Sequence, residues 1–366
     1  MKILFVIPTV GTGGAERVVS ILANYLSKEN EVRIFVMEKS TVERYPINKN
    51  VSIVGANATV RRGNKFKAVI SFAANFMLQR RSLIDEIKNY QPNVAISFLP
   101  KADFLTSIVL RKSKICWIPS ERNDPSRRNL LERKVLCKIY KNSNVLVCQT
   151  EKVSKYYKQN GVMNTCIIKN PLILSSISDP NFKINYKYII SVGRLDKQKN
   201  YEMLIRAFAQ SKEKDNFKEK LVILGDGPEY SNLKKLISDM AMEDYIYLLG
   251  RKTNVTNYLC HASAFCMSSD YEGLPNAMLE AMASNLPIIS TDFFTGAARE
   301  LVDKSNGYIV PVGNTKKMSE AISRMLSKSE KQLIEMGKCS KDKVSILDVE
   351  TISKEWEKII EQSMTR

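Results

Sequence analysis

The sequence predicts an α/β protein made of two successive doubly wound domains, each a parallel sheet covered by helices on both faces. Its 366 residues are about twice the usual length of one domain. Short apolar strand patterns alternate with helical patterns along the whole chain, which is typical of parallel sheets. A polar, irregular stretch over 172–186 interrupts this alternation midway and is typical of a linker. We expect one domain over 1–175, a second over 185–345, and a C-terminal helix over 346–366 that packs back on the first.

The elements are expected in the following order. The first domain begins with a buried strand over 2–8, a glycine turn and a helix over about 15–28, and continues with strands over 32–37, 94–97, 114–119 and 144–149. The second series has strands over 188–192, 221–224, 245–249, 264–267, 287–290 and 307–310, with helices between them. A last helix pattern over 349–364 carries Trp356. Two such domains leave a cleft between them, and ligands of doubly wound sheets bind at the carboxyl ends of the strands.

Composition excludes several classes of protein. The longest apolar run, 68–78, is shorter than the ~18 residues of a membrane span, and the N-terminal apolar segment runs directly into the glycine turn rather than into a cleavage site. The seven cysteines include no C-x-x-C pair, so we expect neither a disulfide framework nor a zinc site, and a reducing cytoplasm fits best. One histidine, His261, leaves almost no material for a Ser-His-Asp triad or a histidine-based metal site.

Positive charge is concentrated in the first half of the chain. Residues 1–180 hold 29 basic and 13 acidic side chains, a net charge of +16, whereas the remainder holds 27 and 25, a net charge of +2. A one-sided basic half indicates a polyanionic partner, either nucleic acid or an anionic membrane surface.

Three motifs follow predicted strands. Glycines at 11, 13 and 14 precede a helix and let backbone N–H groups approach a phosphate or a sugar, although the same pattern also makes a simple tight turn. The run 193–200 brings Arg194 and Lys199 into a second strand-end loop, where two cations can neutralise a diphosphate. The run 268–280 places Glu272 before, and Glu280 within, a helix that begins near Pro275.

Taken together, these motifs resemble the retaining glycosyltransferases of family 4, which have the GT-B fold of two Rossmann-like domains facing across a cleft. The Glu-x7-Glu pattern of Glu272 and Glu280, within Glu-Gly-Leu-Pro, is the family's most specific motif, and Gly-Arg-Leu at 193–195 and Gly-Gly-Ala-Glu at 13–16 support it. The resemblance covers essentially the whole chain and is strongest over 188–311. It looks closest to members that extend lipid-linked oligosaccharides with UDP-activated hexose or N-acetylhexosamine.

The resemblance implies a role for each matching residue. Glu272, Arg194 and Lys199 would form the catalytic centre, with the two cations on the donor diphosphate and Glu272 on hydroxyls of the donor sugar, while Glu280 would hold the ribose diol. The implied donor-binding residues are Gly13, Gly14, Arg194, Lys199, Gly225, Arg251, Lys252, Gly273, Leu274, Pro275, Asn276 and Glu280. Glu16 is expected on the acceptor side. No cofactor and no metal are expected, because the chain has no Asp-x-Asp pair of the kind that metal-dependent transferases use.

One position departs from the family pattern. Many members have a histidine near the reacting carbon in the N-terminal half, whereas this chain has no histidine before His261. The corresponding segment is Ser-Glu-Arg-Asn-Asp-Pro at 120–125, with Arg122 near the expected position. A cation there is expected to hold an oxygen of the acceptor or donor. We expect His261 to be structural, at the end of a helix.

A basic amphipathic segment lies at 61–90. Apolar residues recur at helical spacing, and the cations Arg61, Arg62, Lys65, Lys67, Arg80 and Arg81 come before any acidic side chain. An apolar stripe that carries cations suits a membrane interface or a lipid diphosphate, and it also fits a core-facing helix with a charged rim.

The sequence therefore predicts a retaining, metal-independent hexosyltransferase that acts on a polyprenyl-diphosphate-linked glycan in surface polysaccharide assembly, such as O-antigen or capsule. Its expected partners are a UDP-sugar, the lipid-linked acceptor and an anionic membrane surface, with a peripheral location on the cytoplasmic face of the plasma membrane. Two alternatives remain: a UDP-sugar epimerase of the same architecture, and a basic nucleic-acid-binding protein. No zinc-finger spacing or aromatic RNA-binding motif supports the latter, so no nucleic acid is expected.

Overall fold

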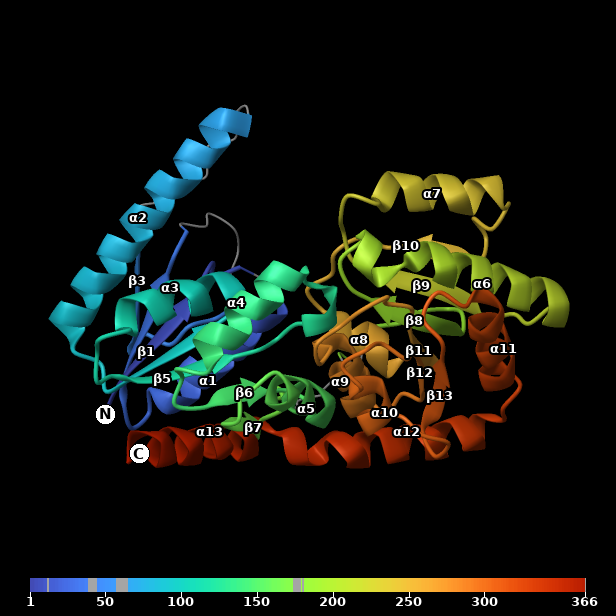
Figure 1. Ribbon diagram of the computed structural model, residues 1–366. Helices are drawn as coiled ribbons and strands as arrows, with labels where there is room; N and C mark the ends of the chain where they lie inside the picture. Colours follow the sequence, from blue (N-terminus) through green and yellow to red (C-terminus); the bar gives the residue numbers. More distant parts are fainter. Residues whose placement is uncertain (12, 39–44, 57–64, 174–178, 180, 366) are drawn as a thin grey trace. The chain divides into compact units, whose positions relative to one another are not determined.

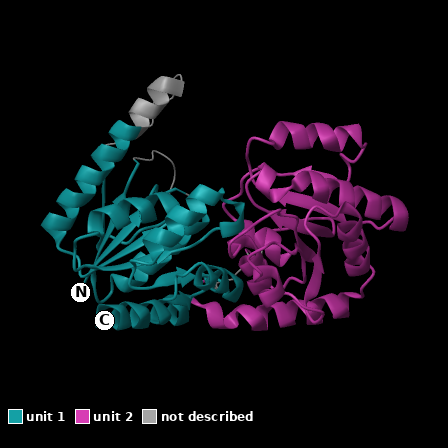
Figure 2. Ribbon diagram, viewed as in Figure 1, with its two compact units in different colours: residues 1–171, 349–366 teal, residues 172–348 magenta. Residues whose placement is uncertain are grey.

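The computed structural model, shown in Figure 1, describes residues 1–11, 13–38, 45–56, 65–173, 179 and 181–365, and for 65–72 it describes the backbone but not the side chains. The chain forms two compact units (Figure 2). Unit 1 comprises residues 1–171 and 349–366, and unit 2 comprises residues 172–348.

Unit 1 is a parallel sheet in the order β3-β2-β1-β4-β5-β6-β7. Its strands are β1 Lys2–Ile7, β2 Glu31–Val36, β3 Val51–Gly55, β4 Val94–Phe98, β5 Cys116–Ser120, β6 Leu146–Cys148 and β7 Thr165–Ile167. Its α-helices are α1 Gly14–Leu26, α2 Lys65–Tyr90, α3 Pro100–Leu110, α4 Leu130–Tyr140, α5 Glu151–Gln159 and α13 Val349–Met364, with a 3-10 turn η1 at Pro125–Arg127.

Unit 2 is a second parallel sheet, in the order β10-β9-β8-β11-β12-β13. Its strands are β8 Tyr188–Val192, β9 Lys220–Leu224, β10 Ile246–Leu248, β11 Ala264–Met267, β12 Ile288–Thr291 and β13 Gly307–Val310. Its α-helices are α6 Tyr201–Asp215, α7 Tyr230–Asp239, α8 Val255–Cys260, α9 Asn276–Ala283, α10 Ala297–Leu301, α11 Thr315–Leu326 and α12 Glu330–Val344, with 3-10 turns η2 at Lys197–Lys199 and η3 at Ser345–Leu347.

The predicted class, α/β with two doubly wound parallel sheets, is confirmed. The central strands are buried on both faces, as helix-covered parallel strands must be. Strands β3 and β7 were not predicted from the sequence, because both lie at sheet edges and are only partly buried, so neither shows a continuous apolar run.

The C-terminal helix α13 belongs to unit 1, where it packs against α1 and β5. Its Trp356 is fully buried and stacks on Phe98, with the ring centroids 6.0 Å apart. The last 18 residues therefore complete the core of a unit whose other residues lie more than 170 positions earlier in the chain.

The strand order reverses direction at two places, between β1 and β4 in unit 1 and between β8 and β11 in unit 2. At such a switch point the loops that leave neighbouring strands diverge, and their carboxyl ends form a ligand-binding crevice. The motif at 11–16 follows β1, and those at 193–200 and 268–275 follow β8 and β11. Each predicted site motif thus lies next to the switch point of its own unit.

Candidate active site

The loops that follow β8, β9 and β10 are tied to one another through their backbones. The Leu195 N–H donates to the Asp226 carbonyl at 2.9 Å, and the Gly225 N–H donates to the Gly250 carbonyl at 2.9 Å. Gly225 has a φ of +149°, and a Cβ on it would lie 1.9 Å from the Gly193 carbonyl oxygen. A glycine is therefore required at 225, and the β8 loop gains a fixed backbone position.

The centre of the site in unit 2 is an ion pair between Lys199 and Glu272. The Lys199 ammonium Nζ lies 2.5 Å from Glu272 Oε1, and the two side chains are 18% and 9% exposed. Gln198 donates through Nε2 to the other carboxylate oxygen of Glu272 at 3.3 Å and to the Tyr271 carbonyl at 2.9 Å. The structure thus brings together two predicted residues that are 73 positions apart in the sequence.

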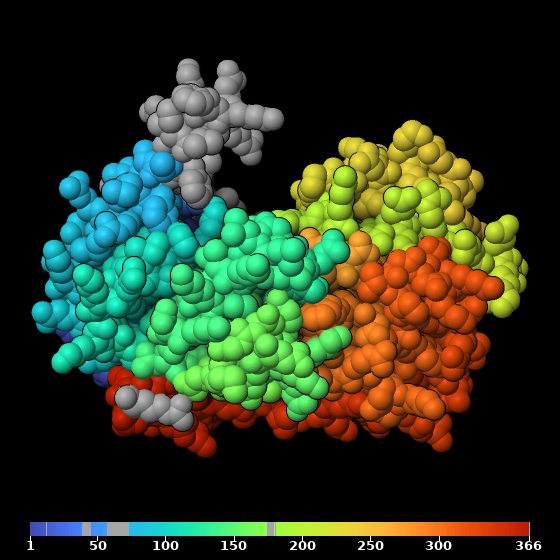
Figure 3. Space-filling model, in the orientation of Figure 1, coloured from blue at the N-terminus to red at the C-terminus, as the bar shows by residue number. Residues whose placement is uncertain are grey.

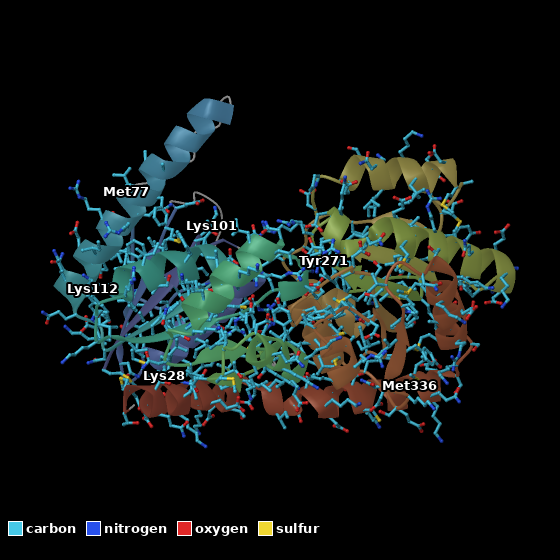
Figure 4. All side chains as sticks on the ribbon, in the orientation of Figure 1. Lys28, Met77, Lys101, Lys112, Tyr271 and Met336 are labelled. Atoms are coloured by element: carbon cyan, nitrogen blue, oxygen red, sulfur yellow. The ribbon has the colours of Figure 1, made fainter. Side chains whose placement is uncertain are left out.

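Backbone contacts hold the β8 and β11 loops against each other. The Asp270 N–H donates to the Gln198 carbonyl at 2.8 Å, and the Ser268 hydroxyl donates to the Lys199 carbonyl at 2.7 Å. Asn200, in the left-handed conformation at φ +46°, caps α6 and donates through Nδ2 to Asp270 at 2.8 Å. Figure 4 labels Tyr271 in this region. These contacts fix the backbone on which the ion pair is mounted.

Arg194 lies at the solvent-facing rim of the same loop. Its guanidinium binds the Asp196 carboxylate at 2.6–2.7 Å, while its side chain remains mostly exposed. An exposed pair of this kind contributes little to stability, so Arg194 can exchange this partner for a ligand at low cost. A rim cation and a half-buried cation therefore share one strand-end loop.

Helix α9 begins directly after this loop, with Pro275 at its N-cap. The Thr295 hydroxyl donates to the Gly273 carbonyl at 2.9 Å and so anchors the turn before the helix. Glu280 lies inside α9, a little more than one turn from its start, as the sequence predicts. Within this turn Leu274 and Pro275 are buried, whereas Gly273 and Asn276 are partly exposed.

Arg251 and Lys252 follow β10, next to the Gly250 turn, and Arg251 is exposed. The single histidine, His261, ends α8 and makes a 2.8 Å hydrogen bond through Nδ1 with the Asn257 carbonyl oxygen, which agrees with a structural role.

In unit 1 the glycine motif starts helix α1. Gly13 is its N-cap residue, and both Gly13 and Gly14 are exposed. Glu16 folds back toward this turn, so that a Cβ on Gly13 would lie 2.3 Å from its carboxylate, and it accepts a hydrogen bond from the Thr9 hydroxyl at 3.0 Å. Because the carboxylate occupies the space beside Gly13, a side chain at position 13 would displace it.

Arg122 is buried, with 7% of the residue exposed. Its guanidinium lies over the ring of Phe98 at 4.8 Å and near that of Trp356 at 5.8 Å, and it donates through Nη1 to Asn170 at 2.7 Å. Its Nε and Nη2 have no hydrogen-bond partner within the described part of the chain. Burial lowers the pKa of Arg122 to about 9, which leaves it charged at neutral pH. The expected contact of Arg122 with a substrate oxygen stays a prediction, since the guanidinium is enclosed here by unit 1.

Sequence reasoning missed a buried network beside Arg122. Glu121 binds Arg128 at 2.5 Å and accepts a hydrogen bond from the Tyr157 hydroxyl at 2.5 Å. Burial would raise the pKa of the Glu121 carboxyl, but Arg128 and the hydrogen bonds outweigh it and hold that pKa below its ordinary value. The signal for this network in the sequence is weak: it consists of Arg128 seven positions after Glu121, which directly follows β5.

The basic segment predicted over 61–90 corresponds mainly to α2. Arg80 and Arg81 lie on this helix, partly and well exposed. The predictions for Arg61 and Arg62 fall outside the described residues, and for Lys65 and Lys67 only the backbone is described.

Comparisons with known proteins agree with this geometry. Residues 176–340 match the family model for glycosyl transferases group 1. The chain is 28% identical over 335 residues to an N-acetylgalactosamine-N,N'-diacetylbacillosaminyl-diphospho-undecaprenol 4-alpha-N-acetylgalactosaminyltransferase of Campylobacter jejuni, covering 89% of this chain and 90% of the relative. It is 27% identical to a second transferase of that organism, which acts on a GalNAc-containing diNAcBac-PP-undecaprenol, with 98% of both chains covered.

Two solved structures share the fold over nearly the full length. A sucrose-phosphate synthase from Thermosynechococcus elongatus superposes with a TM-score of 0.83 at 16% identity, covering 99% of both chains. The HepE protein of Anabaena, solved in complex with UDP, superposes with a TM-score of 0.79 at 15% identity, covering 99% of this chain and 100% of that one. These likenesses show the GT-B fold that the motifs imply. The chain is therefore a glycosyltransferase, and its residues 176–340 are the part that matches the model of the glycosyl transferases group 1 family.

Proposed function

We propose that the protein transfers a hexose or N-acetylhexosamine from a UDP-sugar to a polyprenyl-diphosphate-linked glycan, with retention of configuration and without a metal ion, in the assembly of a surface polysaccharide. The observation that carries the proposal is the Lys199–Glu272 pair in the β8 and β11 loops, with Arg194 at the rim. A half-buried cation, a rim cation and a carboxylate at one strand-end crevice suit a sugar diphosphate.

The chemistry follows from what these side chains can bind. In a glycosyl transfer the bond between the sugar and the diphosphate breaks, and negative charge grows on the departing phosphate oxygen. Lys199 and Arg194 would stabilise that charge, because fixed cations favour the transition state over the ground state. Lys199 would then leave Glu272, whose carboxylate would accept hydrogen bonds from sugar hydroxyls. Retention would follow if the acceptor hydroxyl attacks the face that the diphosphate leaves, so that its oxygen bonds to the sugar while its proton passes to the departing phosphate oxygen.

The relatives support the substrate class. Both Campylobacter transferases are named for acceptors on undecaprenyl diphosphate, and both are named as N-acetylgalactosaminyltransferases. UDP is bound in the HepE structure. We extend these features to this chain as part of the proposal, together with the binding of the ribose diol by Glu280 and of the base side by Arg251 and Lys252.

The cellular setting follows from the acceptor. No helix within the described ranges is long and apolar enough to span a bilayer. We propose that the enzyme meets its lipid-linked acceptor as a peripheral protein on the cytoplasmic face of the plasma membrane, held by the excess positive charge of residues 1–180.

The test is a screen of UDP-glucose, UDP-galactose and their N-acetyl counterparts for UDP release, with a polyprenyl-diphosphate glycan as acceptor. We expect one donor to give acceptor-dependent release and a longer glycan. An epimerised donor without transfer would favour the epimerase alternative. The same reactions with EDTA test the metal: activity abolished by EDTA and restored by manganese would contradict metal independence.

A further inference from the structure

Helices α2, α3 and α4 form a neighbouring group on one surface of unit 1. Contacts join α2 to α3 and α3 to α4, and Phe76 packs against Phe104 between the first two, with centroids 5.9 Å apart. Figure 3 shows the atoms of the three helices on the visible face of unit 1.

The outward side of this group carries large apolar side chains in water. Leu130 and Leu131, at the start of α4, are each 73% exposed. Met77 and Leu78 on α2 are also exposed, and Phe104 on α3 is partly so; Figure 4 labels Met77 on α2 and Lys101 at the start of α3. Single exposed apolar residues are ordinary, but a cluster on adjoining helices marks an interaction surface.

Helical geometry places cations beside the leucines. At roughly 100° per residue, Leu131, Lys134 and Lys138 fall on the side of α4 away from its buried residues Leu136, Cys137 and Tyr140. Leu130, in the first turn, lies at the border between the two sides and is nevertheless exposed. Lys134 and Lys138 are exposed, as is Arg127 just before the helix. The acidic Glu132 lies at the flank of this side rather than within it.

The start of α4 is held rigidly, so the leucines are presented by ordered backbone. The Asn129 side chain caps the helix by accepting from the Glu132 N–H at 2.9 Å. The Arg133 guanidinium donates through Nε to the Arg128 carbonyl at 2.7 Å and also binds the Ser126 carbonyl. The capped first turn of α4 therefore holds both exposed leucines on an ordered backbone.

We propose that the outward sides of α2, α3 and α4 dock on an anionic lipid bilayer, with Leu130 and Leu131 inserting between headgroups and Arg127, Lys134 and Lys138 contacting them. Charge complementarity selects a lipid surface over a second copy of the chain, because two copies would bring these cations together. The proposal rests on the proposed function, since a lipid-linked acceptor brings the enzyme to a bilayer, and it adds α3 and α4 to the contact.

The test is sedimentation with vesicles of phosphatidylcholine, with and without phosphatidylglycerol, in the absence of any sugar donor. For Leu130→Ser/Leu131→Ser we expect binding to the anionic vesicles to weaken about ten-fold or more, because two leucines lose their burial in the interface. Lys134→Gln/Lys138→Gln should weaken binding at low salt and resemble the wild type at high salt.

The matched control is Ile334→Ser/Ile346→Ser, which removes two exposed isoleucines of unit 2. It should bind vesicles like the wild type, and all variants should melt at the same temperature. Unchanged binding of the leucine variant, or an equal loss in the control, would overturn the proposal. So would a wild-type dimer in ultracentrifugation that the leucine variant abolishes, since a second copy would then cover the face.

Transfer to a short-chain, water-soluble acceptor separates this proposal from the proposed function. The leucine variant should retain wild-type transfer on that acceptor, because neither leucine lies in the site of unit 2. If the wild-type protein binds vesicles through the leucines but transfers no sugar, the docking proposal stands and the proposed function is wrong. Loss of soluble transfer in a folded leucine variant would overturn a docking role and place the leucines at the acceptor instead.

Discussion

Unit 1 and unit 2 contain the same strand order around their switch points, yet the carboxyl ends of their sheets carry opposite electrostatic arrangements. In unit 2 the charged groups are at or near the surface: Arg194 is exposed at the rim of the β8 loop, and the Lys199–Glu272 pair is half-buried. In unit 1 the charged groups turn inward, with Glu121 paired to Arg128 and Arg122 enclosed by aromatic rings. The same fold therefore exposes charged groups at the carboxyl edge of one sheet and encloses them at the carboxyl edge of the other.

This difference explains why net charge alone does not locate the chemistry. Most of the excess positive charge lies in residues 1–180, but the cations suited to a diphosphate lie in unit 2, whose part of the chain is almost neutral. The excess in unit 1 lies on surfaces such as those of α2 and α4. The excess charge of unit 1 is thus suited to attraction to a surface, as proposed, whereas the cations of the β8 loop in unit 2 are suited to binding at a point.

The largest effect on activity should come from breaking the ion pair of unit 2. We expect Glu272→Ala to lower turnover by roughly ten- to a hundred-fold, since a lost charged hydrogen bond costs about 1.5–3 kcal/mol. Glu280→Ala should mainly raise the dissociation constant for UDP. Steady-state kinetics and UDP titration by calorimetry distinguish the two, and near-wild-type kinetics for both variants would remove these roles.

The second effect concerns the backbone that holds the pair. Gly225→Ala should destabilise unit 2 by about 3 kcal/mol or more, because its φ of +149° and its approach to the Gly193 carbonyl exclude a Cβ. Gly11→Ala is the control, since nothing lies within 4 Å of its Cβ position and its φ is not in the left-handed region. Urea denaturation measures both variants. Equal stabilities would show that the β8 and β9 loops are not held as described.

The third prediction tests the contrast at Arg122. Arg122→Met should change the free energy of unfolding by less than about 1 kcal/mol, because removing a buried, incompletely bonded cation offsets the lost contacts with Phe98 and Asn170. If the guanidinium turns toward substrate during the reaction, transfer should fall about ten-fold, with UDP affinity unchanged; this is the outcome we expect. Unchanged transfer would show that Arg122 contributes only to packing at the carboxyl edge of the unit 1 sheet.

Apart from the edge strands β3 and β7, the strands and the motif positions were predictable from sequence, because strand patterns, glycine turns and the Glu-x7-Glu spacing are local signals. The partners of the site residues were not. Lys199 pairs with Glu272, 73 positions away in the sequence. Nothing in either motif indicates that the residue proposed to bind the diphosphate and the residue proposed to bind the sugar pair with each other in the free protein. Arg122 is enclosed because Trp356 returns from the C-terminal helix, a contact that no periodicity encodes.

The smallest expected effect comes from a buried carboxyl group in unit 1. Asp103 in α3 is fully buried and accepts from the Ser97 hydroxyl at 2.6 Å and from the Tyr140 hydroxyl at 2.7 Å. Among the residues that the structure describes, no cation hydrogen-bonds to it. Burial raises its pKa well above the ordinary value, although the two hydrogen bonds act in the opposite direction. The folded state therefore binds the Asp103 proton more tightly than the unfolded state, in which the carboxyl releases it above about pH 4.

The sign of the pH dependence follows from this proton. Because the folded state binds more protons, the contribution of Asp103 to stability is complete below the unfolded pKa and declines as the pH rises toward the folded pKa. Asp103→Asn, which resembles the neutral acid, should remove that decline, so the stability difference between variant and wild type should shift in favour of the variant from pH 5 to pH 7. Urea midpoints at the two pH values measure the shift. A difference that does not change with pH would mean that Asp103 is ionised in the fold, and that unit 1 tolerates an uncompensated buried anion as well as the buried cation of Arg122.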